Sequence, residues 1–231
     1  MRTVAETGST NADMLALARS GVAEGLWLRA ERQSSGRGRQ GRTWVSPVGN
    51  LSASTLVRLR VTDPQAATLA LVAAVAVEET VSVYLPARAA LKWPNDLLID
   101  GAKVSGILLE RADDAVVIGI GVNLAHHPAG LERRTTNLAA QGVTPEAAEF
   151  LETLAESFAR WLARWRGEGI APVRGRWLER AHPLGTALTA HLPDGSAVEG
   201  LFQGLDADGA LILRLADGTA RVIHAADVFL I

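Results

Sequence analysis

The chain has 231 residues, enough for one large domain or for a large domain and a small one. Its content of 48% hydrophobic and 21% charged residues is typical of a folded globular protein. A formal net charge of −2 argues against broad charge-driven nucleic-acid binding, and the absence of cysteine excludes disulfides and zinc–thiolate sites. The N-terminus has no signal-length apolar stretch, and the apolar run at 66–77 is too short to span a bilayer, so we expect a cytoplasmic protein without a membrane partner.

Hydrophobic periodicity predicts alternating helices and strands in the first half of the chain. A capping box at residues 10–13 opens a short helix that Gly21 ends. Asp63 and Pro64 are expected to cap a helix that runs to about residue 81 and is apolar on nearly every face. Asp100 and Gly101 form a hairpin signal. Strands are predicted at 26–30, 51–59, 90–93, 97–99, 104–109 and 116–122, with a glycine- and arginine-rich loop at 33–50.

The second half of the chain is predicted to contain two helices followed by a series of short strands. Apolar residues at helical spacing predict an amphipathic helix whose aromatic stripe belongs to the core: Phe150, Leu151, Leu154, Ala155, Phe158, Trp161, Leu162 and Trp165. Another helix is expected at 172–180. Beyond residue 183, three Asp-Gly turns separate short strands, which predicts a small β-barrel. We therefore expect an α/β domain at 1–183 and a barrel at 184–231.

The most unusual segment is a loop of glycine and arginine: Gly36, Arg37, Gly38, Arg39, Gln40, Gly41 and Arg42. It matches G-x-G-x-x-G, but no helix follows it, as a dinucleotide-binding turn requires. Glycines let a backbone approach a ligand closely, and arginines attract anions, so the loop could act as a mobile clamp. Trp44 would add an aromatic face. The alternative is a solvated basic loop or a nonspecific RNA-binding patch.

A second dense segment places a cation, an aromatic ring, an amide and a carboxylate within five residues: Lys92, Trp93, Pro94, Asn95 and Asp96. Asn95 and Asp96 carry oxygen ligands of the kind Mg²⁺ prefers beside nucleotide phosphates, although Asn-Asp after proline is also ordinary turn chemistry. Of the 23 basic residues only Lys92 and Lys103 are lysine. A compact ammonium suits a site beside a reacting phosphate or carboxylate, whereas chance and coding bias explain the count equally well until the lysines are placed.

Taken in order, these motifs resemble those of the biotin protein ligase family. The resemblance spans essentially the whole chain and is carried by Ser9-Thr10-Asn11, Gln33, the loop at 36–42, Lys92-Trp93-Pro94-Asn95-Asp96, Lys103 and Gly121-Val122-Asn123. It implies a catalytic domain related to class II aminoacyl-tRNA synthetases, with a central mixed β-sheet, followed by a small SH3-like barrel. It further implies ATP-dependent formation of biotinyl-AMP and transfer of biotin to a lysine of a biotin carboxyl carrier protein.

The resemblance also assigns roles to individual residues. Lys103, Arg37 and Arg39 would be catalytic. Biotin would be bound by Ser9, Thr10, Asn11, Gln33, Gly36, Arg37, Gly38, Arg39, Lys103 and Gly106. ATP would be bound by Arg39, Arg42, Trp44, Lys92, Asn95, Asp96 and Asn123, with Asn95 and Asp96 as Mg²⁺ ligands.

Two further expectations concern partners and rivals. Only eight residues precede Ser9, so we expect no DNA-binding domain and no DNA partner, and the chain would act as a monomer or homodimer. The nearest rival is a lipoate protein ligase, which makes the same kind of adenylate from a linear dithiolane acid. A noncatalytic RNA-binding module is the other, and salt-dependent RNA binding would distinguish it.

Overall fold

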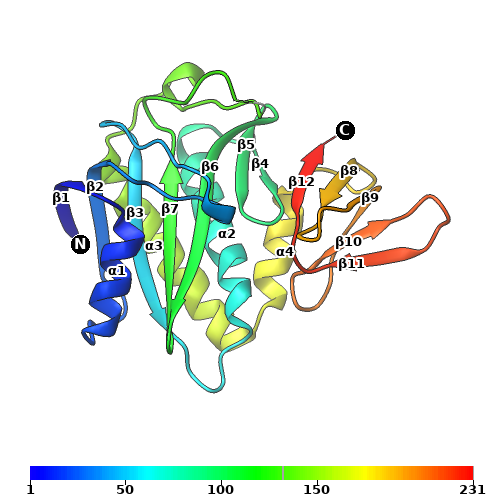
Figure 1. The fold of residues 1–231 in the computed structure, drawn as a ribbon, viewed down its shortest axis with the longest axis horizontal. Helices are drawn as coiled ribbons and strands as arrows, with labels where there is room; N and C mark the ends of the chain where they lie inside the picture. Colours follow the sequence, from blue (N-terminus) through cyan, green and yellow to red (C-terminus); the bar gives the residue numbers. More distant parts are fainter. Residues whose placement is uncertain (132, 231) are drawn as a thin grey trace.

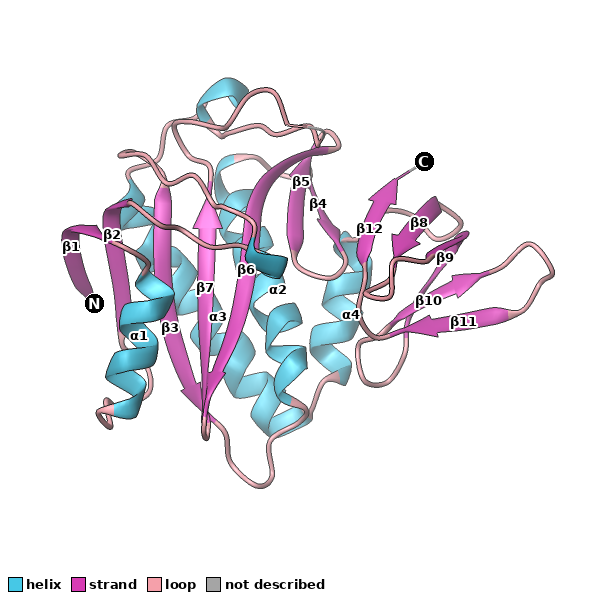
Figure 2. Cartoon of the chain, in the orientation of Figure 1, coloured by secondary structure: helices cyan, strands magenta, loops and turns pink. Residues whose placement is uncertain are grey.

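A computed structural model of the chain describes residues 1–131 and 133–230, and within these ranges it contains two β-sheets and four α-helices (Figures 1 and 2). The helices are α1 (Thr10–Arg19), α2 (Leu69–Tyr84), α3 (Ala147–Glu168) and α4 (Ala171–Arg180). The large sheet contains β1 (Arg2–Thr7), β2 (Trp27–Gln33), β3 (Leu51–Arg58), β4 (Ala89–Lys92), β5 (Asp96–Ile99), β6 (Ala102–Ala112) and β7 (Ala115–Val122). The small sheet contains β8 (Ala187–His191), β9 (Ala197–Leu205), β10 (Leu211–Arg214), β11 (Ala220–Ile223) and β12 (Asp227–Leu230).

The large sheet is mixed, which confirms the predicted fold class. Its strand order is β1-β2-β3-β7-β6-β5-β4, and β1 runs parallel to β2 while the other neighbours are antiparallel. The edge strand β1 was not predicted. Its side chains are mostly exposed and polar, so it lacks the alternation that signals a strand, and only pairing with β2 gives it this conformation.

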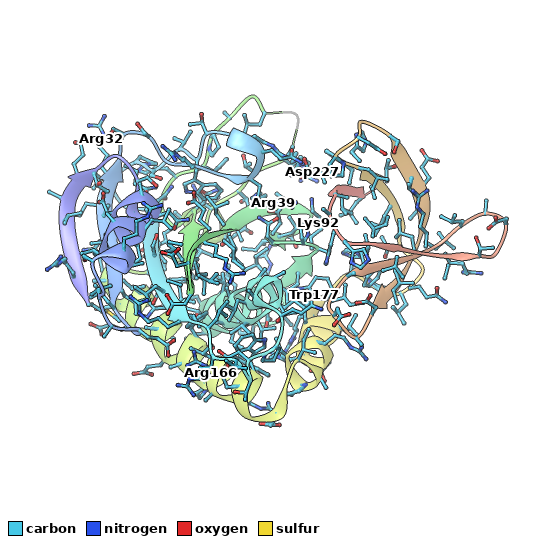
Figure 3. The ribbon with its side chains drawn as sticks, turned by 60° about the horizontal axis from the view of Figure 1, so that its bottom comes forward. Arg32, Arg39, Lys92, Arg166, Trp177 and Asp227 are labelled. Atoms are coloured by element: carbon cyan, nitrogen blue, oxygen red, sulfur yellow. The ribbon has the colours of Figure 1, made fainter. Side chains whose placement is uncertain are left out.

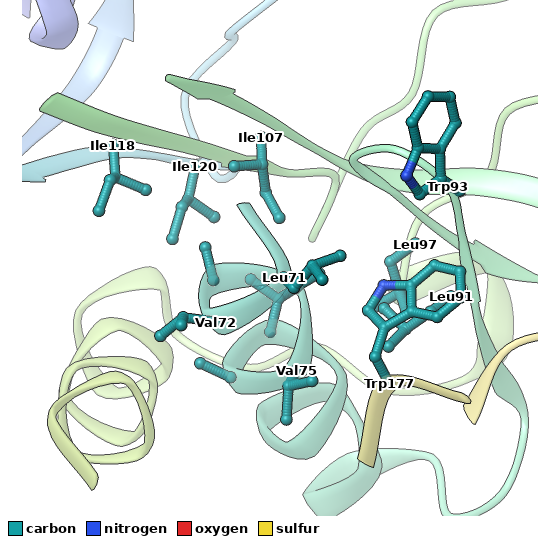
Figure 4. Packing of buried hydrophobic residues seen from close by; sticks show 14 of the residues in the cluster. Leu71, Val72, Val75, Leu91, Trp93, Leu97, Ile107, Ile118, Ile120 and Trp177 are labelled. Atoms are coloured by element: carbon teal, nitrogen blue, oxygen red, sulfur yellow. The ribbon is translucent and has the colours of Figure 1, made fainter. Parts of the chain in front are cut away.

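One face of the large sheet carries the main hydrophobic core. Alternate residues of β7 (Val116, Ile118, Ile120 and Val122) point to this face, where α2 and α3 cover them (Figure 4). The apolar run predicted at 66–77 belongs to a longer helical segment, Ala66–Tyr84. By length and composition alone, this segment could cross a membrane. In this fold 67% of that window is buried, so its apolar surface packs as a core helix.

The opposite face is covered only in part, by α1. Met14, Leu28, Leu56 and Val117 form a smaller cluster beneath that helix. Past the end of α1 the same face carries small or polar residues, including Ser52, Ser54, Gly119 and Gly121. The sheet therefore separates an apolar core from an open floor on which a ligand could lie.

The helices α1 and α2 begin at positions that differ from those predicted. Ser9 rather than Thr10 is the N-cap of α1, and it makes no side-chain capping bond. Asp13, the far member of the predicted capping box, instead accepts a hydrogen bond of 2.6 Å from Thr7 Oγ1. The second helix begins with a 3₁₀ turn at Ala66–Thr68, not at Asp63-Pro64. The predicted core stripe of α3 is confirmed, because Phe150, Leu151, Leu154, Phe158, Trp161 and Trp165 are buried.

The predicted barrel region forms a five-stranded antiparallel sheet with the order β11-β10-β9-β8-β12. The predicted boundary after residue 183 falls between α4 and β8, and Ile231 lies outside the described residues. Trp177 of α4 packs edge-on against Phe202 of β9, with ring centroids 6.4 Å apart. Trp93 Nε1 donates a hydrogen bond of 3.1 Å to the Gly209 carbonyl. These contacts fix the small sheet beside β4 and the pocket.

His182 lies at this junction, with its ring 4.7 Å from that of Phe202. Burial, with a smaller effect of Lys92, lowers its pKa from 6.5 to about 4. The unfolded chain therefore takes up the proton first as pH falls, and stability is lost between pH 6.5 and about 4. The phenyl ring of His182→Phe cannot titrate. Between pH 6.5 and about 4, we therefore expect the free energy of unfolding of this variant, measured with urea, to fall by about 1–2 kcal/mol less than that of the wild type. Equal losses in the two proteins would contradict this prediction.

Candidate active site

A cavity of about 280 Å³ lies on the open face of the large sheet. The glycine–arginine loop, β6, β7 and the segment after β7 surround it, and β12 closes one side. Its lining brings together side chains that are far apart in the sequence: Ser9, Thr10, Asn11, Gln33, Arg37, Arg39, Arg42, Trp44, Asn95, Asp96, Lys103, Asn123, Arg133 and Asp227. Such a concave, mostly apolar site with a few polar groups is the usual form of a ligand pocket.

The inner end of the cavity is a hydrogen-bonded network of amides and hydroxyls. Gln33 Oε1 accepts from Thr10 N at 2.8 Å and lies 3.1 Å from Thr10 Oγ1, while Gln33 Nε2 donates to Ser46 Oγ at 2.8 Å. Ser54 Oγ lies 2.7 Å from Asn11 Oδ1 and 2.8 Å from Thr10 Oγ1. Because the Asn11 oxygen can only accept, the single Ser54 proton goes there. The network fixes neutral donors and acceptors in place.

Three glycines form the floor, and each leaves room for a predicted site residue. A Cβ on Gly119 would lie 2.2 Å from Asn11 Oδ1, and one on Gly121 would lie 2.3 Å from the Trp44 ring. Gly106, which pairs with Gly121 across β6 and β7, would place a Cβ 3.1 Å from Lys103 Nζ. Glycine within a strand often marks a close approach of this kind. The Trp44 ring therefore lies directly on the sheet.

We expect Gly121→Ala to displace Trp44 while leaving the fold intact. The added methyl group collides with the indole, which can move because it belongs to a loop, so the free energy of unfolding should fall by only about 1 kcal/mol. Binding of a ligand under Trp44 should weaken about ten-fold or more. Calorimetry with biotin, the ligand that the resemblance implies, tests this, and Gly167→Ala, whose Cβ would meet nothing within 4 Å, is the control. Unchanged binding would place Trp44 outside the ligand site.

The glycine–arginine loop is folded back on itself. Gly38 N donates to Arg42 O at 2.7 Å, and Trp44 N donates to Gly36 O at 2.9 Å. A Cβ on Gly36 would lie 2.3 Å from the Trp44 carbonyl oxygen, a backbone atom that cannot move aside cheaply. Glycine at 36 thus permits the hairpin that presents Arg37 and Arg39 to the cavity.

Both lysines of the chain contact the same carboxylate. Asp96 is buried and forms an ion pair with Lys103, with Lys92 at 3.4 Å and with Arg133 at 3.6 Å. Burial by itself would raise the pKa of Asp96, but the three cations outweigh it and the pKa lies below its usual value. Burial lowers the pKa of Lys92, which also donates to Val228 O at 2.8 Å. The structure thus brings both lysines of the chain to one buried carboxylate at the cavity.

Asn95 and Asp96, as placed here, do not fit a metal held by the protein. Asn95 Oδ1 accepts from Arg39 at 3.3 Å, and its amide nitrogen donates to the Ile107 carbonyl. Asp96 is surrounded by cations, and no cluster of three acidic or histidine ligands occurs among the described residues. Mg²⁺ prefers several accessible oxygens, which this pair does not offer. The side chains of Asn95 and Asp96 are thus already occupied by partners from the chain itself.

The outer end of the cavity is rich in arginine. Asp227, from β12, forms ion pairs with Arg42, with Arg133 at 3.7 Å and with Arg39 at 4.0 Å. Arg39, Lys92 and Asp227 lie where the two sheets meet (Figure 3). Burial lowers the pKa of the Arg39 guanidinium, an effect opposed by the nearby carboxylates, and an arginine keeps its charge at any physiological pH. The cavity thus changes from neutral and polar inside to strongly cationic outside.

The structure gathers nearly all of the predicted site residues in one place. Gly36 and Lys92 are the two that do not line the cavity; Gly36 shapes the loop, and Lys92 lies behind Asp96. Sequence reasoning missed Arg133 and Asp227. Neither belongs to a recognisable motif, and Asp227 reaches the site only because the small sheet docks beside it. The assigned roles of individual residues remain predictions.

This arrangement suits one kind of chemistry. A polar inner end can hold a neutral head group, while the outer cations can offset repulsion between a carboxylate and a phosphate chain. Three buried polar atoms, Trp44 Nε1, Ser52 Oγ and Asn123 Oδ1, lie on lining residues and find no hydrogen-bond partner among the described residues. Buried polar atoms normally have partners, so these are groups that a ligand could satisfy.

Comparison with known proteins agrees with the geometry. Residues 8–123 match the Biotin/lipoate A/B protein ligase family, and residues 184–231 match the Biotin protein ligase C terminal domain. The chain is 44% identical over 239 residues to a biotin--[acetyl-CoA-carboxylase] ligase of Paracoccus denitrificans, with 98% of each chain covered. It is 36% identical over 232 residues to the enzyme of that name from Mycobacterium tuberculosis, covering 97% of this chain and 86% of that one.

A solved structure shows the same architecture. The biotin protein ligase from Aquifex aeolicus in complex with biotin and ATP has a TM-score of 0.89 and 26% identity, and 99% of this chain and 98% of that one are covered. A mixed sheet with this pocket, joined to a small antiparallel sheet, defines an enzyme of the biotin/lipoate ligase class. The chain belongs to the biotin protein ligase family.

Proposed function

We propose that this chain joins biotin to AMP at the expense of ATP and then transfers biotin to a lysine of a carrier protein. The observation that carries the proposal is Lys103. Its ammonium lies between the neutral inner network and the cationic outer end, paired with Asp96 and 5.7 Å from the Trp44 ring. A carboxylate entering from one end and a phosphate from the other would meet there.

The inner network supports biotin as the acid. The ureido ring of biotin needs both donors and acceptors, and Asn11, Thr10 and Gln33 supply amide and hydroxyl groups in fixed orientations. Leu108, which pairs with Gly119 on the cavity side of the sheet, and the Trp44 ring line the cavity beside them and suit the apolar part of the molecule. An anionic head group would find no counter-charge within this hydrogen-bonded set, because its members are neutral apart from the Glu110 carboxylate, which accepts from Asn11 Nδ2 at 2.8 Å.

The first step needs electrostatic help. The biotin carboxylate attacks the α-phosphorus of ATP and pyrophosphate leaves, so two anions must approach each other. Lys103, Arg37 and Arg39 provide positive charge at the junction, where a partly buried site strengthens the attraction. Mg²⁺ enters this proposal only as the counter-ion that accompanies the ATP phosphates.

The second step transfers the acyl group to an amine. The acceptor lysine attacks the biotinyl carbonyl carbon of the mixed anhydride, the C–O bond to phosphorus-bound oxygen breaks, and AMP leaves. Until then the hairpin at 36–42 shields the intermediate from water. The names of the relatives support a carrier domain of acetyl-CoA carboxylase as the acceptor.

A paired exchange assay tests the proposal. With [³²P]pyrophosphate and ATP, we expect label to enter ATP when biotin is present and to remain at background with lipoate, because the inner network matches a urea and not a dithiolane. If label entered ATP with lipoate and not with biotin, the substrate would be lipoate. Exchange with neither acid, together with salt-dependent RNA binding, would favour a noncatalytic binding protein.

A further inference from the structure

The C-terminal sheet contributes one residue, Asp227, to the described lining of the cavity. Its side chain is 15% exposed and is enclosed by Arg39, Arg42 and Arg133. Two of these arginines come from the glycine–arginine loop and the third from the segment after β7. A single carboxylate therefore gathers cations from two separate parts of the large domain.

The backbone and ring beside Asp227 act in the same sense. The Ala226 carbonyl accepts from both terminal nitrogens of Arg39 at 3.4 Å, and the Val228 carbonyl accepts from Lys92. The Arg133 guanidinium lies 4.6 Å from the centre of the Phe229 ring. The start of β12 thus presents oxygens and an aromatic face to four cations. A polyanion would offer these cations oxygen contacts of the same kind.

The cavity lining carries more positive than negative charge, so its arginines need a counter-ion when no ligand is bound. Among the described lining residues, five basic side chains face two carboxylates, a formal excess of three positive charges. Asp96 already pairs with Lys92 and Lys103, so the loop arginines depend on Asp227 for neutralisation. Without it, Arg39, Arg42 and Arg133 would repel one another at short range. With a triphosphate present, the same arginines would have a better partner and Asp227 would repel the phosphate.

We propose that Asp227 is a resident counter-ion of the phosphate site, which holds Arg39, Arg42 and Arg133 together and is exchanged for nucleotide phosphate oxygens when ATP binds. Arg133 is then a phosphate-binding residue. The proposal builds on the proposed function and extends it, because it makes nucleotide binding a competition between the substrate and a side chain of the C-terminal sheet. The exchange keeps the cations in position for the phosphate at the cost of some affinity.

Binding of inorganic tripolyphosphate to the full chain, measured by calorimetry at low salt, tests the exchange. We expect Asp227→Asn to bind about three- to ten-fold more tightly than the wild type, because the amide keeps the shape but no longer competes. Asp217→Asn removes the same charge from the far turn of the β10–β11 hairpin and should leave binding unchanged (Figure 1). Unchanged or weaker binding by Asp227→Asn would overturn the proposal.

A second variant keeps the test decisive if Asp227→Asn does not fold. Arg133→Gln leaves β12 intact and should weaken tripolyphosphate binding at least about ten-fold, with a smaller dependence on salt. Binding equal to that of the wild type would overturn the exchange. Tripolyphosphate contains neither base nor biotin, so these results are separate from the exchange assay. A chain that binds it as expected but shows no acid-dependent exchange would contradict the proposed function and leave the counter-ion role standing.

Discussion

Lys103→Ala should reduce biotin-dependent ATP–pyrophosphate exchange by about 100-fold or more. Removing a preorganised charge from the place where two anions react typically raises the barrier by about 3–4 kcal/mol. Lys103→Arg should recover little of this activity, because a planar guanidinium cannot occupy the space of a compact ammonium beside Gly106 and Trp44. Asp96 keeps Lys92 and Arg133 as partners, so the variant should still fold.

The control for this prediction comes from the same strand. Arg111 of β6 is exposed, and its guanidinium donates to the carbonyl of Asp113, its one hydrogen-bond partner among the described residues. Arg111→Ala should therefore keep exchange within about two-fold of the wild type. Thermal unfolding of each variant separates loss of chemistry from loss of structure. Near-wild-type exchange by a folded Lys103→Ala protein would remove Lys103 from the adenylation step.

Arg39→Gly should release the acyl-adenylate before the acceptor docks. Arg39 joins the loop to Asn95, to the Ala226 carbonyl and to Asp227, so its loss leaves the ion pair of Arg42 with Asp227 to hold the hairpin against the small sheet. The loop would then open more often, and we expect free biotinyl-AMP to rise about ten-fold or more. Biotin would consequently appear on lysines of proteins added to the reaction that are not carriers. Chromatography of the nucleotide and streptavidin blots measure the two effects.

The site of labelling gives this prediction an internal check. The chain contains only two lysines, and both are paired with Asp96, whereas arginine stays protonated and does not act as a nucleophile at neutral pH. We therefore expect the released adenylate to label added proteins and hardly the ligase itself. Arg60→Gly, at an exposed position two residues beyond the end of β3, is the matched control and should release no adenylate. The absence of leakage from Arg39→Gly would contradict the clamp.

The long amphipathic helices and the chemical motifs could be predicted because their signals are local. The spacing of Phe150, Phe158 and Trp165 specifies which side of α3 is buried, whatever lies opposite. The motifs around Arg39 and Lys103 likewise predicted most of the cavity lining, since each group of residues is contiguous in sequence. The alternating glycines Gly119 and Gly121 indicate a close approach to this strand, but only the structure shows that Asn11 and Trp44 are the side chains that approach it.

Other features depended on contacts between distant segments. β1 has no apolar alternation and is a strand only through its pairing with β2. Thr10 was expected to cap α1, but its hydroxyl lies in the network with Gln33 and Ser54, which no neighbour in sequence reveals. Asp227 lies 188 positions after Arg39 in the chain, and it is a lone acidic residue among small and apolar neighbours, so the local sequence does not mark it as a site residue.

By itself, then, the sequence predicted the glycine–arginine loop, the two lysine-bearing motifs and the family to which the chain belongs, because short-range patterns encode all three. Only the tertiary structure decided that Lys92 and Lys103 share Asp96, and that a carboxylate from the C-terminal sheet neutralises the arginines. The physical reason is that ion pairs act through space. Their partners are selected by how two sheets dock, which no local pattern records.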